Sequence, residues 1–302
     1  MKKYNKFSLG FLALLSTANL LAQSFEPRLY SNAPTGMNFL VAGYNYSSGA
    51  LMTDPALGLK DPNINLHIGV LAYVKTFGVF GKAAKFNILL PTANLNGDAK
   101  TDNGVTLTKD VSGLGDIKTK LSINLFGSPA LNIKEFRAYK QDLIIGANIE
   151  ITAPTGKYEK EKTINIGTNR WATKVGIGAS KAINNFTLEF LADAEFYTAN
   201  TEFKSDIKRE QNNVYSTQTH LIYNIQRGMW CALNANYYWG GSTSEDGIER
   251  SKDFSNSRYG FVFTMPLNKQ NSIKINGSSG ISTRTGTDFD SIAIFWQYAW
   301  FD

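Results

Sequence analysis

The sequence predicts an all-β protein: a transmembrane antiparallel β-barrel of about twelve strands that forms one domain. Three patterns lead to this prediction. Apolar and polar residues alternate along most of the chain. The alternating segments run for roughly ten to thirteen residues, close to the ~9–11 residues that a tilted strand needs to cross a bilayer and longer than the ~5–6 of an average soluble strand. The connections between them are short and long in turn.

The alternation is clearest in the segment DIKTKLSINLF, residues 116–126. Ile117, Leu121 and Ile123 fall on one face, and Lys118 and Lys120 fall on the other. A strand separates the two sets completely, whereas a helix would mix them around its circumference. The same pattern marks DLIIGANIEIT (142–152), FTLEFLADAEF (186–196) and WCALNANYYW (230–239). Weaker alternation predicts further strands near residues 37–46, 65–76, 83–94, 170–182, 214–226, 257–266, 272–281 and 290–301.

The connections predict which end of the barrel faces which compartment. Short ones such as INN (183–185) and QRG (226–228) alternate with long polar ones such as PTGKYEKEKTINIGTN (154–169). Short periplasmic turns and long extracellular loops are typical of outer-membrane barrels. An even number of strands then leaves both chain termini on the periplasmic side.

One expected periplasmic turn, within residues 126–141, is unusually long. Asn132 is followed three residues later by Glu135, the spacing of a helix capping box, so a short helix is expected with Ile133 and Phe136 on one side. A plain loop is the alternative.

Composition excludes several classes of protein. The 302-residue chain has a mean hydropathy of −0.22, and no apolar run after the N-terminus approaches the ~20 residues of a membrane helix. Cys231 is the only cysteine, so no internal disulfide forms, and two distant histidines, His67 and His220, make a zinc site improbable.

Residues 1–22 have the basic start, apolar stretch and small-residue end of a signal peptide, with cleavage expected after Ala22. A buried N-terminal helix is the alternative. Residues 23–302 are then one exported barrel domain. The net charge is +6, and loss of the lysines at positions 2, 3 and 6 leaves +3, too small an excess to indicate a nucleic-acid partner.

The apolar strand faces are expected to meet lipid. A soluble barrel of about twelve strands would enclose more space than inward apolar side chains could fill, although a large soluble sandwich remains an alternative. Outward apolar faces leave a polar lumen with charges of both signs, which can pair. The expected lumen-lining residues are Lys118, Lys120, Glu150, Lys174, Glu189, Asp193, Glu195 and His220.

The two ends of the mature chain carry further candidates. Glu26 and Arg28, in the leader 23–36, could enter the lumen as a plug, or the leader could extend into the periplasm. In the last strand Trp296, Tyr298 and Trp300 share the lipid-facing side and are the expected assembly signal. Outer-membrane barrels often end on an aromatic residue, whereas this chain ends Phe301–Asp302, and we assign the terminal role to Trp300.

Several stretches carry a family resemblance. They are EPRLYSNAPTGMNFLVAGY (26–44), VLAYVKTFGVFGKAAKFNILLP (70–91), GLGD (113–116), SPAL (128–131), ITAPTGKY (151–158), NIGTNRW (165–171), SNSRYG (255–260) and STRTGTDFD (282–290). In these the chain resembles the outer-membrane transporter-like proteins of the MetA-pathway of phenol degradation family, over nearly the whole mature length. The resemblance implies an outer-membrane barrel that handles small, often aromatic or hydrophobic compounds. It carries over no binding residues.

We therefore expect a non-enzymatic channel in the outer membrane of a Gram-negative bacterium. It would let small, hydrophobic or aromatic compounds pass through a polar lumen without a cofactor, metal or catalytic residue. Its expected partners are the solute, outer-membrane lipid and the barrel-assembly machinery. Two alternatives stay open: a lipid hydrolase that uses His220 or His67, and a structural or adhesive barrel that acts through its long loops.

Overall fold

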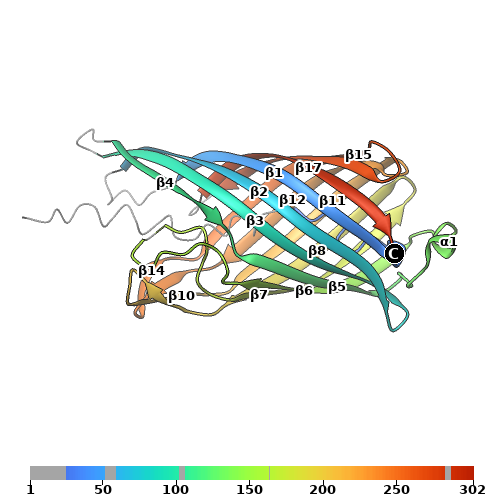
Figure 1. The fold of residues 1–302 in the computed structure, drawn as a ribbon, viewed down its shortest axis with the longest axis horizontal. Coiled ribbons are helices and arrows are strands. Elements are labelled where there is room, and N and C mark those ends of the chain that lie inside the picture. Colours follow the sequence, from blue (N-terminus) through green and yellow to red (C-terminus); the bar gives the residue numbers. More distant parts are fainter. Residues whose placement is uncertain (1–24, 52–58, 102–105, 163, 283–286) are drawn as a thin grey trace, which may run out of the picture.

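The chain folds into a closed antiparallel barrel (Figure 1). The computed structural model describes residues 25–51, 59–101, 106–162, 164–282 and 287–302, so the expected signal peptide lies outside the described residues. The strands of the barrel are β1 (Met37–Leu51), β2 (Leu59–Val79), β3 (Lys82–Thr101), β4 (Thr106–Leu114), β5 (Ile117–Phe126), β6 (Leu143–Ala153), β7 (Ala172–Ile183), β8 (Phe186–Tyr197), β11 (Val214–Gln226), β12 (Met229–Gly240), β15 (Phe254–Pro266), β16 (Asn271–Ser282) and β17 (Thr287–Phe301).

The barrel wall is crossed twelve times. β4 and β5 are consecutive along the chain, and both pair with β3. β4 pairs with the extracellular half of β3 and β5 with the periplasmic half of β3, so the two together make one crossing of the wall. Pairing of β2 with β3 closes the sheet. Closure satisfies the backbone N–H and C=O groups without water, as a structure inside a bilayer requires. The predicted fold class and the predicted strand number are confirmed.

A second, four-stranded sheet lies at the end of the barrel opposite the C-terminus (Figure 1). It consists of β9 (Asn200–Phe203), β10 (Ile207–Gln211), β13 (Thr243–Glu245) and β14 (Ile248–Ser251), in the order β14-β13-β10-β9. β9 and β10 lie in the connection from β8 to β11, and β13 and β14 in the connection from β12 to β15. These are long connections, which mark this end as extracellular.

The strands direct apolar side chains outward, as the alternation predicts. In β6, Ile145, Ile149 and Ile151 are exposed on the outer surface, whereas Asn148 and Glu150 are buried within the barrel. Exposure of aliphatic side chains to the surroundings of a barrel is stable only where those surroundings are apolar. The outer surface is therefore a lipid-facing band.

The extracellular half of β2, β3 and β4 departs from this rule, because its buried inner face is apolar. Loop 154–171 folds into the barrel there, and its Ile164 and Ile166 pack against this face. The buried residues that form this apolar patch are Ile64, Leu66, Ile68, Ala93, Leu95, Val111, Ile164 and Ile166. Asp116 anchors the loop by accepting hydrogen bonds from the backbone N–H groups of Gly156 and Thr168, both at 2.8 Å. The lumen is therefore not polar throughout, contrary to the sequence prediction.

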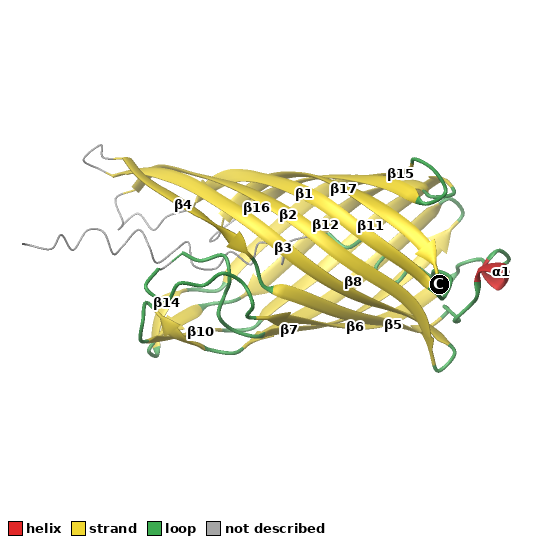
Figure 2. Cartoon of the chain, viewed as in Figure 1, coloured by secondary structure: helices red, strands yellow, loops and turns green. Residues whose placement is uncertain are grey.

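The periplasmic end carries the helix α1 (Ile133–Phe136), drawn red in Figure 2. The Asn132 side chain accepts hydrogen bonds from the N–H groups of Lys134 and Glu135, and the Glu135 carboxylate accepts one from the N–H of Asn132. The predicted helix and its capping box are confirmed. Among the described residues, no helix combines the length and the apolar character that a membrane span requires.

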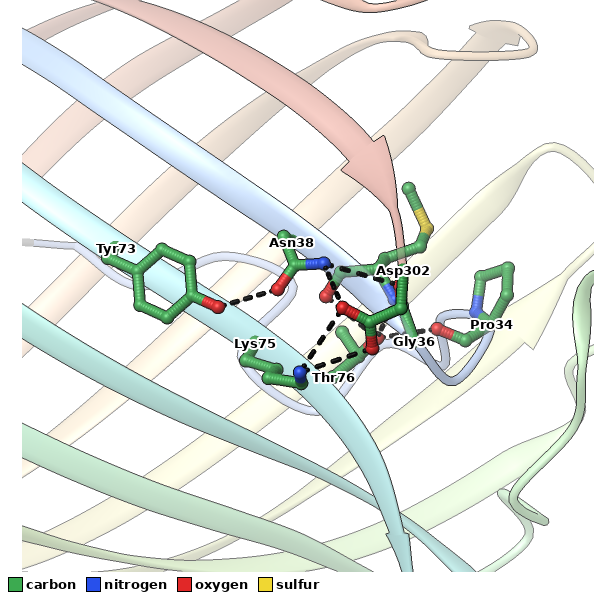
Figure 3. Close-up of polar contacts among 8 residues, drawn as sticks. Pro34, Gly36, Asn38, Tyr73, Lys75, Thr76 and Asp302 are labelled. Carbon is green, nitrogen blue, oxygen red and sulfur yellow. Dashed lines mark hydrogen bonds and ion pairs between the residues drawn. The ribbon is translucent and has the colours of Figure 1, made fainter.

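The first and last strands of the barrel pair with one another, β1 with β17 (Figure 3). The backbone N–H of Asp302 donates to the carbonyl of Gly36 at 3.0 Å. Its carboxylate accepts a hydrogen bond from Asn38 at 2.9 Å and forms an ion pair with Lys75 at 3.1 Å. These contacts hold the pKa of Asp302 below its usual range, chiefly through the hydrogen bond from Asn38. Asp302, which follows the last aromatic residue, thus stabilises closure of the barrel between β1 and β17.

Candidate functional site in the barrel lumen

The segment 25–36 enters the barrel from its periplasmic end, and its first residues contact β11 and β5, which are not neighbouring strands. Phe25 sits edge-on to His220 of β11, with ring centroids 6.4 Å apart. The backbone N–H of Glu26 donates to the side chain of Gln218 of β11 at 3.2 Å. The Glu26 carboxylate pairs with Lys120 on β5. One residue of the segment therefore connects two walls of the barrel.

Arg28, the other expected plug residue, is fixed through both its backbone and its side chain. Its N–H donates to Glu189 at 2.7 Å. Its guanidinium donates to Asn224 and lies over the ring of Trp230, 4.8 Å from the centroid. Lys85 donates to the carbonyl of Leu29 at 2.9 Å. These contacts come from β3, β8, β11 and β12, so the segment is held from several directions.

Tyr30 is the most deeply seated residue of the segment, with 1% of its surface exposed. Its hydroxyl accepts a hydrogen bond from Asn148 at 2.7 Å, and its carbonyl accepts one from Asn124 at 2.9 Å. Gly146 and Gly178 are cross-strand neighbours beneath the ring. A Cβ at Gly178 would lie 2.6 Å from the ring, and one at Gly146 would overlap it more severely. The two glycines thus form the seat for Tyr30, which the sequence interpretation did not identify.

The expected charged residues of β5, β6 and β7 converge on one carboxylate. Glu150 is 7% exposed. Its oxygens lie 3.6 Å from the ammonium of Lys118, 2.9 Å from that of Lys120 and 3.8 Å from that of Lys174. Ion pairing of this kind offsets the free energy of taking charges out of water. We call this side of the lumen, β5 to β8, the charged wall.

Of the remaining expected lumen residues, three lie on β8 and one on β11. Asp193 and Glu195 are on the same inward face as Glu189, and Glu195 is directly opposite Lys174 in the pairing of β7 with β8. Glu189 also accepts a hydrogen bond from Ser180 at 2.8 Å. His220 is fully buried, opposite Glu189 in the pairing of β8 with β11.

The imidazole of His220 is held by an amide rather than by a nucleophile. Its Nδ1 lies 2.8 Å from the side-chain oxygen of Asn234. Ser216, four residues earlier on the same strand, pairs with Asp193 and Tyr238 in the registers of β11. His67, the other histidine, lies beside Tyr44, which is exposed on the outer face, with 2.6 Å between its Nδ1 and the tyrosine hydroxyl.

Part of the lumen surface on β11, β12 and β15 is apolar, although buried polar side chains such as Asn234 and Arg258 lie on the same strands; we call it the apolar wall. Ile222, Ala232 and Val262 form a buried cluster against Trp230. Phe295 lies directly over Gly43, where any side chain would overlap its ring. The lumen thus has a charged wall and an apolar wall, with segment 25–36 between them.

The aromatic residues of the last strand lie in a row on the outer surface. Tyr298 and Trp300 stack with ring centroids 5.6 Å apart, and Trp296 stacks on Tyr298 at 6.3 Å. Tyr73 of β2 contacts Trp300 at 6.3 Å. Phe301 projects on the other side of the strand. This placement is the one an interfacial aromatic girdle has.

Comparison with known proteins bears on the family and on the fold. The model of the family described as Putative MetA-pathway of phenol degradation matches residues 29–297. The crystal structure of the COG4313 outer membrane channel from Pseudomonas putida F1 is similar, with a TM-score of 0.77 and 20% identity over 92% of this chain and 100% of that chain. The transport unit of the autotransporter AIDA-I from Escherichia coli has a TM-score of 0.55 and 10% identity over 98% of this chain and 99% of that chain. No curated protein matches. At such identities the solved structures show a shared outer-membrane barrel fold.

Proposed function

This chain belongs to the Putative MetA-pathway of phenol degradation family, and from its lumen we propose that it is an outer-membrane channel for passive passage of small hydrophobic or aromatic compounds. One observation carries the proposal: an apolar wall and a charged wall line the same lumen. An apolar wall lets a hydrophobic solute leave water without a large barrier, since burial of apolar surface is favourable by roughly 25 cal/mol per Å².

The charged wall is expected to keep the rest of the lumen hydrated and to set its ion selectivity, as rings of charged side chains do in other pores. Segment 25–36 acts as the plug of this channel, with Glu26, Arg28 and Tyr30 as its anchors. The name of the similar Pseudomonas putida structure, an outer membrane channel, is consistent with this function.

Transport by the full chain in liposomes tests the proposal. Liposomes that contain the purified barrel should take up toluene or benzyl alcohol faster than empty liposomes, and planar bilayers should show small conductance steps. The variant Lys118→Ser should change cation-to-anion selectivity without blocking uptake of the neutral solute. A barrel that passes no solute and carries no current would contradict a channel function.

The same preparation tests the two other classes of function. A lipid hydrolase would release fatty acid from phospholipid in detergent and lose that activity in His220→Ala. The hydrogen bond of His220 to Asn234, and not to a serine, argues for a non-enzymatic barrel. An adhesive barrel would bind a partner through its long loops and give neither flux nor fatty acid.

A further inference from the structure

Two buried arginines lie at the extracellular end of the lumen, outside the charged wall and the plug. Arg209 is on β10 of the small sheet and Arg170 is near the end of loop 154–171; they are 6% and 8% exposed. The Arg170 guanidinium donates to the side chain of Gln211, which is two residues after Arg209 on the same face of β10. Alternate residues of a strand are about 7 Å apart, so the two guanidinium groups are neighbours.

Each guanidinium carbon lies over an aromatic ring. Arg170 is 4.4 Å from the ring centroid of Tyr197, and Arg209 is 4.6 Å from that of Phe203. Tyr197 is the last residue of β8 and continues the inward face that carries Glu195. Contact with a ring face uses none of the N–H groups of a guanidinium.

The nearest carboxylate on the small sheet is already engaged by other cations. Glu245 is directly opposite Arg209 in the pairing of β10 with β13. Its oxygens lie 3.4 Å from Lys204 and 3.3 Å from Arg250. The Nη1 atom of Arg209 is buried and has no hydrogen-bond partner among the residues that the structure describes. Burial lowers the pKa of Arg209 to about 10; the negative charge of Glu245 opposes this shift, and repulsion from Arg170 adds to it.

We propose that Arg170 and Arg209 form a carboxylate-binding subsite at the extracellular entrance of the lumen, which takes the carboxylate of an aromatic acid. Planar guanidinium groups bind a carboxylate through paired N–H donors, and a bound anion would fill the unused Nη1 of Arg209. The rings of Tyr197 and Phe203 lie beside the two guanidinium groups, where the aromatic part of the ligand would pack. The inference rests on the proposed channel function and narrows its solutes.

Calorimetry on the full-length barrel in detergent tests this subsite without reference to flux, with benzoate as the probe. We expect Arg209→Gln to weaken benzoate binding about tenfold or more, because a charge-assisted donor is lost. Arg209→Lys keeps the charge and loses the planar fork, so its affinity should fall between those of the wild type and Arg209→Gln. Lys208→Gln is the matched control: it removes an exposed cation of the same strand, which pairs with Glu210, and should leave benzoate binding unchanged.

Two further ligands separate the alternatives. Benzyl alcohol has the same ring without the carboxylate and should bind equally to the wild type and Arg209→Gln. Phosphate binding as tight as benzoate binding would overturn the assignment to aromatic acids. Unchanged benzoate affinity in folded Arg209→Gln would overturn the subsite itself, whereas failure of benzyl alcohol flux in liposomes would overturn only the channel function.

Discussion

Replacement of Tyr30 by alanine should release the N-terminal segment from the lumen. The change removes a buried aromatic side chain, which costs about 3–5 kcal/mol in packed sites, and the hydrogen bond from Asn148, worth about 1 kcal/mol. The barrel wall is unaffected, so the loss falls on docking of the segment. With a tenfold change for every 1.4 kcal/mol, the undocked fraction rises by about 10³–10⁴-fold.

Limited proteolysis measures this fraction directly, because the bond after Arg28 is a trypsin site that docking holds within the barrel. We expect rapid cleavage there in Tyr30→Ala and larger conductance steps in planar bilayers. Tyr30→Phe keeps the ring and should raise cleavage only about fivefold, as expected for one hydrogen bond. Gly146→Ala leaves the segment unchanged and displaces the ring from below, so it should resemble Tyr30→Ala. Cleavage and conductance in Tyr30→Ala equal to those of the wild type would refute the reasoning.

Three other outcomes follow from the structure. Charge reversal of Lys118 and Lys120 to glutamate should shift the reversal potential of planar bilayers toward cation selectivity, and an unchanged potential would show that these side chains do not face the conducting path. The double variant Trp300→Ala, Tyr298→Ala should reduce the amount of heat-modifiable, folded barrel in the outer membrane, and normal assembly would rule out this pair as the assembly signal. The pKa of Asp302 is lower in the folded barrel than in the unfolded chain, so its stabilising contribution is full above the unfolded pKa and is lost as the pH falls through the folded pKa. Asp302→Asn should therefore weaken the acid dependence of unfolding in detergent below about pH 4, and the same acid dependence in this variant and the wild type would remove Asp302 as its source.

The barrel could be predicted because its signal is local. The alternation in residues 116–126 separates lysines from aliphatic residues within one strand, and no knowledge of the neighbouring strands is needed to read it. The capping box at Asn132 is local in the same sense, since its two side chains are three residues apart. The charged wall follows from the same alternation applied to several strands, once outward apolar faces are assumed.

The features that the sequence did not predict depend on contacts between distant residues. Ile64, Leu66 and Ile68 alternate along β2 in the way that lipid-facing residues alternate along other strands. In the folded barrel they are buried on the inner face, where Ile164 of loop 154–171 packs against them. The seat of Tyr30 requires that Gly146 and Gly178 be opposite one another, which depends on the register of β6 and β7. The small sheet joins two connections that are separated by β11 and β12 along the chain. Only the inward position of these loops brings Arg170 and Arg209 together.

The charged wall also explains why a polar residue of the leader, Glu26, is suited to hold the plug. Three lysines, Lys118, Lys120 and Lys174, share the carboxylate of Glu150. Lys120 pairs with two carboxylates, that of Glu150 and that of Glu26. When the plug leaves, Lys120 loses one of its two carboxylate partners, and water that enters the lumen compensates the charge. Docking of the segment therefore opposes the entry of water at the charged wall. When the segment leaves and the channel opens, the charged wall becomes hydrated. Glu26→Gln should loosen the segment without changing the barrel wall, and it should do so less at high ionic strength, where screening weakens the attraction that is lost.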